Sequence, residues 1–189
     1  MAMDIPEEVR GAIREFVARL QAECPDAKGA RWAQVEGMHV TLKFIGEVPE
    51  EKVERIKKEL AGVRGPARGG ATVEMNFRGV GFFPSAKHPR VFWAGIEATP
   101  ILAEIANEIE KRMERLGIPS EKRAFRPHLT LARFKSEEGL PKLREAIEKA
   151  GAMEFGSTRT SEFHLYQSKL IRGGAVYTKL ETYSVTSGE

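Results

Sequence analysis

Hydrophobic side chains recur every three or four residues in four segments of the chain, which is the spacing of an amphipathic α-helix. In the first segment Val9, Ile13 and Phe16 fall on one face, and Pro6 suits the first turn. Glycine follows the last two segments and is favoured just after a helix end. The pattern predicts helices over Pro6–Glu23, Pro49–Ala61, Ile101–Leu116 and Leu140–Ala150.

Runs of β-branched and aromatic residues between these segments predict strands. The expected strands are Val40–Ile45, Thr72–Val80, Val91–Ile96, Leu129–Phe134, Phe163–Leu170 and Ala175–Val185. The second and third are joined by a long loop (GFFPSAKHPR), and the last two form a hairpin that turns near Arg172-Gly173-Gly174. Residues 62–70 are expected to form a surface loop. Because helices and strands mix without a regular βαβ rhythm, we expect an α+β fold with largely antiparallel sheets.

Composition narrows the class of protein. The chain has 189 residues, 41% hydrophobic and 30% charged, which suits one globular core or two small lobes sharing one. No apolar run reaches the roughly 20 residues that span a bilayer, and no secretory signal is visible, so we expect no membrane partner. The single cysteine, Cys24, excludes an internal disulfide and fits a reducing, cytoplasmic setting.

The polar residue types occur at uneven frequencies. There are 25 Glu but only two Asp, Asp4 and Asp26, which argues against calcium loops and aspartate metal cages. Asn and Gln together number five, a bias typical of heat-adapted proteins. The net charge of +3 and the pI of about 9.0 permit a polyanionic partner without requiring one.

Two of the four histidines begin nearly identical four-residue motifs. Residues 39–42 read His-Val-Thr-Leu and residues 128–131 read His-Leu-Thr-Leu. A given histidine would be followed by x-Thr-Leu by chance roughly three times in a thousand. The copies are separated by close to half the chain, which suggests one two-lobed domain over residues 1–189 with one copy in each lobe.

On a strand, alternate side chains face opposite ways. His39 and Thr41 would then share one face while Val40 and Leu42 anchor the strand, and His128 and Thr130 would be presented in the same way. Two such faces set opposite each other would place two imidazoles and two hydroxyls around one cleft.

Such a cleft suits displacement at phosphorus without a metal or cofactor. A neutral imidazole can take a proton from water while a charged imidazole protonates the leaving oxygen. The threonine hydroxyls can donate hydrogen bonds to phosphoryl oxygens. A buried structural histidine would explain either copy alone but not the repeated word, and a zinc site lacks a third ligand. His88 is expected in a loop and His164 in a strand, partly buried, and neither is given a role.

The two words and their surroundings resemble the RNA 2′,3′-cyclic phosphodiesterase family, historically called 2′-5′ RNA ligase, of the two-histidine phosphoesterase superfamily. The likeness extends over nearly the whole chain. It is carried by Ile5–Val9, Arg31-Trp32, His39–Gly46, Gly81–Pro84, Pro89–Gly95, Phe125–Arg133 and Leu165–Ser168.

The resemblance implies a bilobal fold with pseudo-two-fold symmetry, in which two antiparallel sheets face a central cleft and the helices lie outside. It implies hydrolysis of a terminal 2′,3′-cyclic phosphate on RNA to a 2′-phosphomonoester without metal. By position, His39 is the proton donor, His128 is the proton acceptor that activates water, and Thr41 and Thr130 contact the phosphate.

The sequence departs from this family in two places. Members usually begin with a short apolar strand, of which only Met1-Ala2-Met3 stands before Asp4, so either the start is trimmed or the first sheet loses part of an element. Gly37-Met38 stands before His39 where Asn-Leu is common, which predicts a slightly different entry into the strand.

Further residues are candidates for substrate binding. Alternation along a strand would put Arg126 on the same face as His128 and Arg133 on the opposite face. Arg126 is therefore the better candidate to bind an RNA phosphate, and Arg133 is expected to be a surface or structural arginine. Lys43 would share the face of His39 and Thr41. Phe82 and Phe83 are expected in a loop, where either could stack a base or fill the core.

Three rival functions remain open. An RNA ligase joining 2′-5′ ends and a diesterase for small cyclic nucleotides would use the same geometry. A noncatalytic module that binds RNA ends or nucleotides is a rival of another class, although binding alone needs no acid-base pair. A monomer is the default expectation for the oligomeric state.

Overall fold

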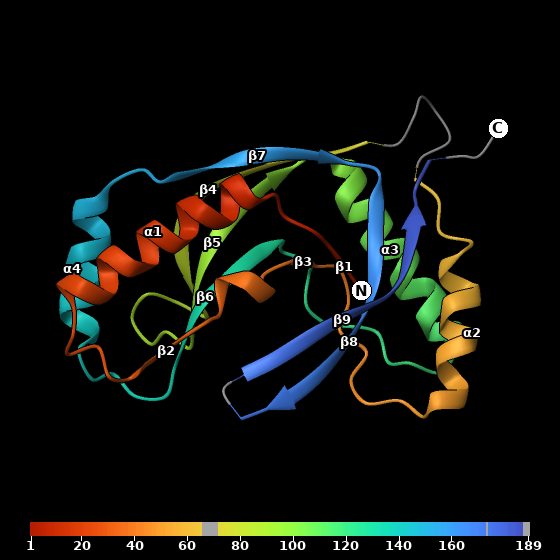
Figure 1. Cartoon of the computed structure of the whole chain (residues 1–189), viewed down its shortest axis with the longest axis horizontal. Helices are drawn as coiled ribbons and strands as arrows, with labels where there is room; N and C mark the ends of the chain where they lie inside the picture. Colours follow the sequence, from red (N-terminus) through yellow and green to blue (C-terminus); the bar gives the residue numbers. More distant parts are fainter. Residues whose placement is uncertain (66–71, 173, 187–189) are drawn as a thin grey trace.

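The computed structural model describes residues 1–65, 72–172 and 174–186 (Figure 1). Within these ranges, four α-helices form where the hydrophobic spacing predicts them. In α1, for example, the five apolar positions of the predicted face are all buried. The bounds are α1 (Glu7–Glu23), α2 (Glu50–Leu60), α3 (Pro100–Arg115) and α4 (Leu140–Ala150).

The nine strands of the described residues form two sheets in which every pair is antiparallel. The four-stranded sheet has the order β3 (Val40–Thr41), β1 (Ala2–Met3), β8 (Glu162–Ile171) and β9 (Gly174–Ser184). The five-stranded sheet has the order β2 (Ala30–Trp32), β6 (His128–Phe134), β5 (Val91–Ala98), β4 (Val73–Phe83) and β7 (Glu154–Thr160). The expected α+β class with two antiparallel sheets is confirmed.

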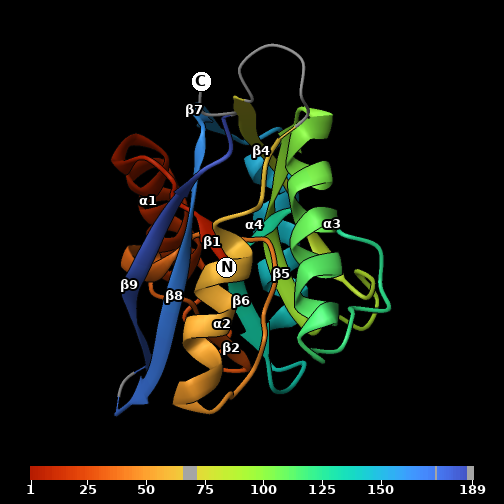
Figure 2. The same cartoon turned by 90° about the vertical axis from the view of Figure 1, so that its right-hand side faces the viewer.

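A pair of helices accompanies each sheet. The pair α1 and α4 packs together, and α1 lies against β7 of the five-stranded sheet. The pair α2 and α3 packs together at the other end of the molecule, beside the four-stranded sheet (Figures 1 and 2). This arrangement agrees with the expected pseudo-two-fold plan with helices on the outside. None of the helices in the described ranges is long and apolar enough to cross a membrane.

Three strands carry too little alternation for the hydrophobic pattern to predict them, although the resemblance implies a shortened first strand. With two and three residues, β1 and β2 are too short to show it. In β7 only Phe155 is buried, so the sequence of this polar edge strand resembles that of a loop. The short N-terminal run nevertheless forms β1, which lies between β3 and β8 and pairs with both.

Two predicted boundaries are wrong. The strand expected over Val40–Ile45 ends at Thr41, because the amides of Leu42 and Lys43 both turn to the carbonyl of Met1. The predicted loop at residues 81–90 begins later, because β4 continues through Phe83 and pairs with β5 up to Val91. Most of the loop expected at residues 62–70 lies outside the described residues, as does the middle of the predicted turn at 172–174.

Candidate active site

The first motif lies at the edge of the four-stranded sheet. Val40 and Leu42 are buried, His39 is half-buried just before β3, and Thr41 is exposed. The predicted alternation across residues 39–42 is therefore confirmed. Because β3 also lies against β6, the strands that carry the two motifs are neighbours although they belong to different sheets.

Two tyrosines from the β8–β9 hairpin enclose the ring of His39. The ring of Tyr166 is stacked on it, with centroids 5.3 Å apart and planes inclined by 13°. Tyr177 meets the same imidazole edge-on at 4.7 Å. These three residues, with Met38 and Asp4, contribute to the lining of a cavity of about 290 Å³. His39 thus lies beside a cavity with aromatic walls.

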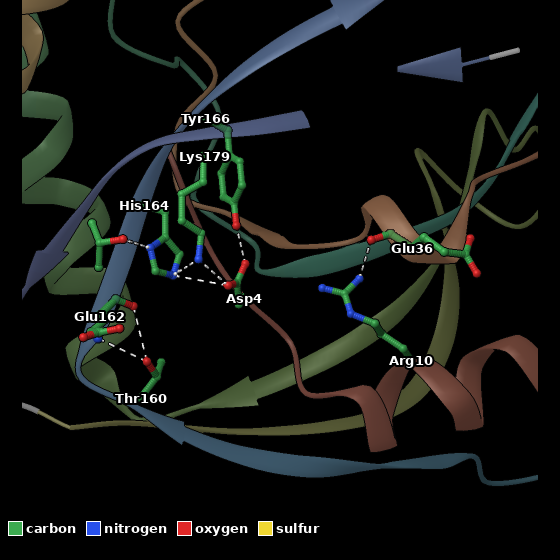
Figure 3. A network of polar contacts seen from close by, with 9 residues as sticks. Asp4, Arg10, Glu36, Thr160, Glu162, His164, Tyr166 and Lys179 are labelled. Atoms are coloured by element: carbon green, nitrogen blue, oxygen red, sulfur yellow. Dashed lines mark hydrogen bonds and ion pairs between the residues drawn. The ribbon is translucent and has the colours of Figure 1, made fainter. Parts of the chain in front are cut away.

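Asp4 organises the polar groups behind Tyr166 (Figure 3). The hydroxyl of Tyr166 donates a hydrogen bond to one oxygen of Asp4, and the ammonium of Lys179 lies 2.9 Å from the other. Burial alone would raise the pKa of Asp4, but the hydrogen bonds from Tyr166 and Lys179 hold it below its usual value. Burial and the Asp4 hydrogen bond raise the pKa of Tyr166, so its hydroxyl stays protonated and keeps donating.

His164 belongs to this network and is buried more completely than the sequence indicated. Its Nδ1 lies 3.0 Å from the hydroxyl of Thr182, and its Nε2 lies 3.4 Å from Asp4. Burial lowers the pKa of His164. We assign it no part in the chemistry, as the sequence suggested.

Burial lowers the pKa of His39 below its ordinary value. A hydrogen bond to the backbone of Gly37 and the negative charge of Asp4 act in the opposite direction. His39 is therefore a stronger acid than a free histidine, and less of it is charged near neutral pH.

The second motif occupies the start of β6. Leu129 and Leu131 are buried, whereas His128 and Thr130 are half-buried on the other face. Nδ1 of His128 lies 2.8 Å from the backbone carbonyl of Arg126. A carbonyl oxygen only accepts hydrogen bonds, so Nδ1 carries the hydrogen and Nε2 of the neutral ring keeps its lone pair. Both motif histidines thus bond to the backbone two residues earlier.

An irregularity in β6 changes the expected face of Arg133. Ala132 lies opposite Phe92, but Thr130 lies opposite Trp93, so Leu131 is an extra residue in β6. Leu131 and Ala132 are consequently both buried, and the alternation resumes one residue later. Arg133 therefore shares the face of His128 and Thr130, and the expectation that it lies on the other face is wrong.

Lys43 is not available to a substrate in this structure. Its side chain is buried and its ammonium lies 2.6 Å from the carboxylate of Glu110 and 3.0 Å from the carbonyl of Pro119. The expected face shared with His39 and Thr41 is wrong because β3 ends at Thr41, so alternation no longer applies at residue 43.

The two phenylalanines lie in β4 and not in a loop, and they face opposite ways. Phe82 packs on Phe92 and Phe134, with ring centroids at 5.1 and 6.1 Å, so it fills the core. Phe83 instead meets Trp93 at 5.1 Å and the ring of His128 edge-on at 5.1 Å. Only Phe83 is placed where it could meet a base beside His128.

The structure also gives the positions of Arg126 and His88. Arg126 is exposed just before β6, and its carbonyl holds His128. His88 lies in the loop between β4 and β5, as expected, and its Nδ1 is 3.2 Å from Glu137. Among the residues described, no three His, Cys, Asp or Glu side chains gather in a group that could hold a metal ion.

The structure also shows site residues that the sequence did not single out. Asp4, Tyr166 and Tyr177 are far from His39 in the chain, and only the sheet order β3-β1-β8-β9 brings them together. The motif Leu165–Ser168 marks Tyr166 as part of the resemblance, but nothing in its spacing indicates a stack on His39.

Two antiparallel sheets that each present a His-x-Thr-x word define a two-histidine phosphoesterase. The LigT like Phosphoesterase family matches residues 3–93 and 96–177, and the chain belongs to this family. The resemblance stated from the motifs is thereby confirmed.

Relatives and solved structures agree with this assignment. The chain is 33% identical over 184 residues to a protein of Methanothermobacter thermautotrophicus named RNA 2′,3′-cyclic phosphodiesterase, covering 97% of this chain and 96% of the relative. It is 37% identical over 155 residues to a protein of the same name from Aeropyrum pernix, covering 81% and 85%. The structure of LigT from E. coli complexed with 3′-AMP superimposes with a TM-score of 0.76 at 26% identity, covering 98% and 96%.

Proposed function

We propose that this protein hydrolyses the 2′,3′-cyclic phosphate at the end of an RNA to a 2′-phosphomonoester, by acid-base catalysis with two histidines and without a metal ion. Membership of the LigT-like family and the names of the relatives support the cyclic phosphodiesterase activity. The proposal treats residues 1–189 as one two-lobed domain that acts as a monomer in the cytoplasm.

The hydrogen bond between Nδ1 of His128 and the carbonyl of Arg126 carries the mechanism. It leaves Nε2 of His128 as the basic nitrogen, as a proton acceptor requires. This nitrogen removes a proton from water as the water oxygen bonds to phosphorus. The bond from phosphorus to the 3′ oxygen then breaks, which leaves the phosphate on the 2′ oxygen.

His39 supplies the proton that the departing 3′ oxygen needs. The lowered pKa of His39 makes its charged form a good donor, and the negative phosphate raises that pKa again once substrate is bound. Thr41 and Thr130, each two residues after a motif histidine, donate hydrogen bonds to the phosphoryl oxygens. After one turnover His128 holds a proton and His39 lacks one, and exchange with water restores both.

Product analysis on two substrates tests this function. An oligonucleotide ending in a 2′,3′-cyclic phosphate should yield the 2′-phosphate, read by its separation from a 3′-phosphate standard. Adding an acceptor with a 5′-hydroxyl should give no joined product. Accumulation of joined RNA would identify a 2′-5′ ligase, turnover of a cyclic mononucleotide alone would identify a nucleotide diesterase, and binding without turnover would identify a noncatalytic module.

Chelation tests the metal-free part of the proposal. Turnover should be unchanged after dialysis against EDTA, because the two imidazoles make both proton transfers. Loss of turnover that added zinc or magnesium restores would contradict it.

A further inference from the structure

The ring of His39 is held by a short turn that comes just before it in the chain. This turn is the 3₁₀ helix η1 (Val35–Gly37), and the ring makes a hydrogen bond to the backbone of Gly37 at its end. The bond favours the charged ring, in which both nitrogens only donate, so its acceptor is the carbonyl of Gly37. The other ring nitrogen of His39 is thereby left for the leaving oxygen.

The turn has only weak internal means of keeping that carbonyl in place. The amide of Gly37 donates to the carbonyl of Gln34 at 3.3 Å, and the amide of Met38 donates to that of Val35 at 3.0 Å. A 3₁₀ turn has poorer hydrogen-bond geometry than an α-helix, and the last carbonyls of a helix have no partner within it. A bond from another element therefore helps to decide where the carbonyl of Gly37 lies.

Arg10 of α1 supplies such a bond (Figure 3). Its Nη1 donates to the carbonyls of Val35 and Glu36, at 3.0 and 2.9 Å. The side chain is only 16% exposed, and hydrogen bonds from a charged donor are roughly twice as strong as neutral ones. The carbonyl of Glu36 belongs to the peptide unit that joins Glu36 to Gly37. Arg10 thus fixes the peptide plane next to the one that binds His39.

Packing restrains the same backbone from another side. A Cβ placed on Gly37 would lie 3.2 Å from two ring carbons of Tyr177, so the turn and this ring are in close contact. Tyr177 in turn meets the ring of His39 edge-on. Arg10, Gly37 and His39 also contribute to the lining of one cavity. The guanidinium, the turn and the imidazole therefore form one continuous set of contacts.

We propose that Arg10 is a positioning residue for the general acid. Through η1 it fixes the carbonyl of Gly37, and with it the orientation in which His39 presents its second nitrogen to the leaving oxygen. The inference rests on the proposed function, in which His39 is the proton donor. Proton transfer needs the two heavy atoms to approach within about 2.6–3.2 Å, so a rotated ring donates poorly. Loss of Arg10 should therefore impair the protonation of the leaving group and no other step.

Two substrates test the inference in Arg10→Ala. The kcat for an RNA ending in a 2′,3′-cyclic phosphate should fall about tenfold, since a misplacement of about 1 Å can cost a hundredfold and the tyrosines still hold the ring. The kcat for a nitrophenyl phosphodiester should stay within about twofold of that of the unaltered protein, because nitrophenolate leaves without a proton. The ratio of the two rates does not depend on how much of the variant is folded, because unfolding lowers both rates equally.

Arg10→Lys separates geometry from charge. Burial is the main cause of the lowered pKa of His39, and the charge of Arg10 adds to it. Lysine keeps that charge, but its ammonium ends one bond short of the position of Nη1 and has no planar fork. The ratio of the two rates in Arg10→Lys should therefore lie between those of Arg10→Ala and the unaltered protein.

Arg14→Ala is the matched control. Arg14 lies one turn further along α1, with Nη2 3.2 Å from the carboxylate of Glu7 and Nε 3.4 Å from that of Glu36. It thus contacts the side chain of Glu36, whereas Arg10 contacts the backbone. The ratio in Arg14→Ala should equal that of the unaltered protein. Equal losses on both substrates in Arg10→Ala, or an equal fall of the ratio in Arg14→Ala, would overturn the inference.

Hydrogen exchange measured by NMR without substrate keeps this test separate from the test of hydrolysis. The ring N–H of His39 that is bonded to Gly37 should exchange faster with water in Arg10→Ala, while the ring N–H of His128 should be unchanged. Failure of the unaltered protein to hydrolyse the cyclic phosphate would refute the proposed function but would not affect this measurement. Unchanged exchange at His39 in Arg10→Ala would refute the positioning role of Arg10 alone.

Discussion

The two motif histidines stand in contrasting surroundings. His39 is half-buried between two tyrosines, one of which is held by Asp4 and Lys179. His128 meets the ring of Phe83 edge-on and is held by a backbone carbonyl. Two nearly identical four-residue motifs therefore hold their imidazoles by different contacts, because the packing around each motif differs.

The largest expected effect comes from removing either imidazole. His39→Ala and His128→Ala should each lower kcat by about 10²–10⁴-fold, the usual contribution of one general acid or base. Circular dichroism and thermal unfolding would show that both variants fold. Near-parental turnover in either variant would contradict the paired assignment.

The choice of leaving group should separate the two roles. A phosphodiester whose leaving group needs no protonation, such as a nitrophenolate, removes the need for an acid but not for a base. It should restore turnover of His39→Ala far more than that of His128→Ala. If His128→Ala gained more, the donor and acceptor roles would have to be exchanged.

The pH profile should be a bell whose His39 limb is displaced. Burial lowers the pKa of His39, and only its charged form donates, so the limb of kcat/KM that reports His39 should lie below the ordinary histidine pKa of 6.5. The same limb in kcat should lie at higher pH, because bound phosphate favours the charged ring. The two limbs are macroscopic values of the pair, so the leaving-group experiment is needed to assign them. A His39 limb that lies at the same pH in kcat and in kcat/KM would contradict this account.

A smaller effect is expected from changing Asp4, the carboxylate that accepts a hydrogen bond from Tyr166. The charge of Asp4 raises the pKa of His39, so Asp4→Asn should lower that pKa further and shift the limb in kcat/KM in the same direction. NMR titration of the His39 ring would measure the shift directly. The titration of His128 in the same sample serves as the internal control, and equal shifts in both rings would indicate a global change of structure. Tyr166→Phe, which keeps the stacked ring, should alter kcat less than Tyr166→Ala.

The local pattern of hydrophobic and polar residues is sufficient to predict the helices and the long strands. Each helix carries a buried apolar face, and β4, β5 and β6 alternate in burial over part of their length. The repeated motif also indicates His39 and His128, because two copies of a rare pattern need no spatial information. Lys43 and Arg133 were misjudged for one reason: alternation was extended beyond Thr41, where β3 ends, and across Leu131, where β6 carries an extra residue.

The sequence by itself determined the helices, the antiparallel α+β class and the two histidines, since each depends on residues close together in the chain. Tertiary structure alone decided which strands became neighbours. The order β3-β1-β8-β9 placed Tyr166 on His39, and the pairing of β2 with β6 set Arg31 against Arg133. Such contacts join residues about a hundred positions apart, and their register depends on bulges and sheet order. These features are set by the packing of the whole core and leave no local periodicity in the sequence.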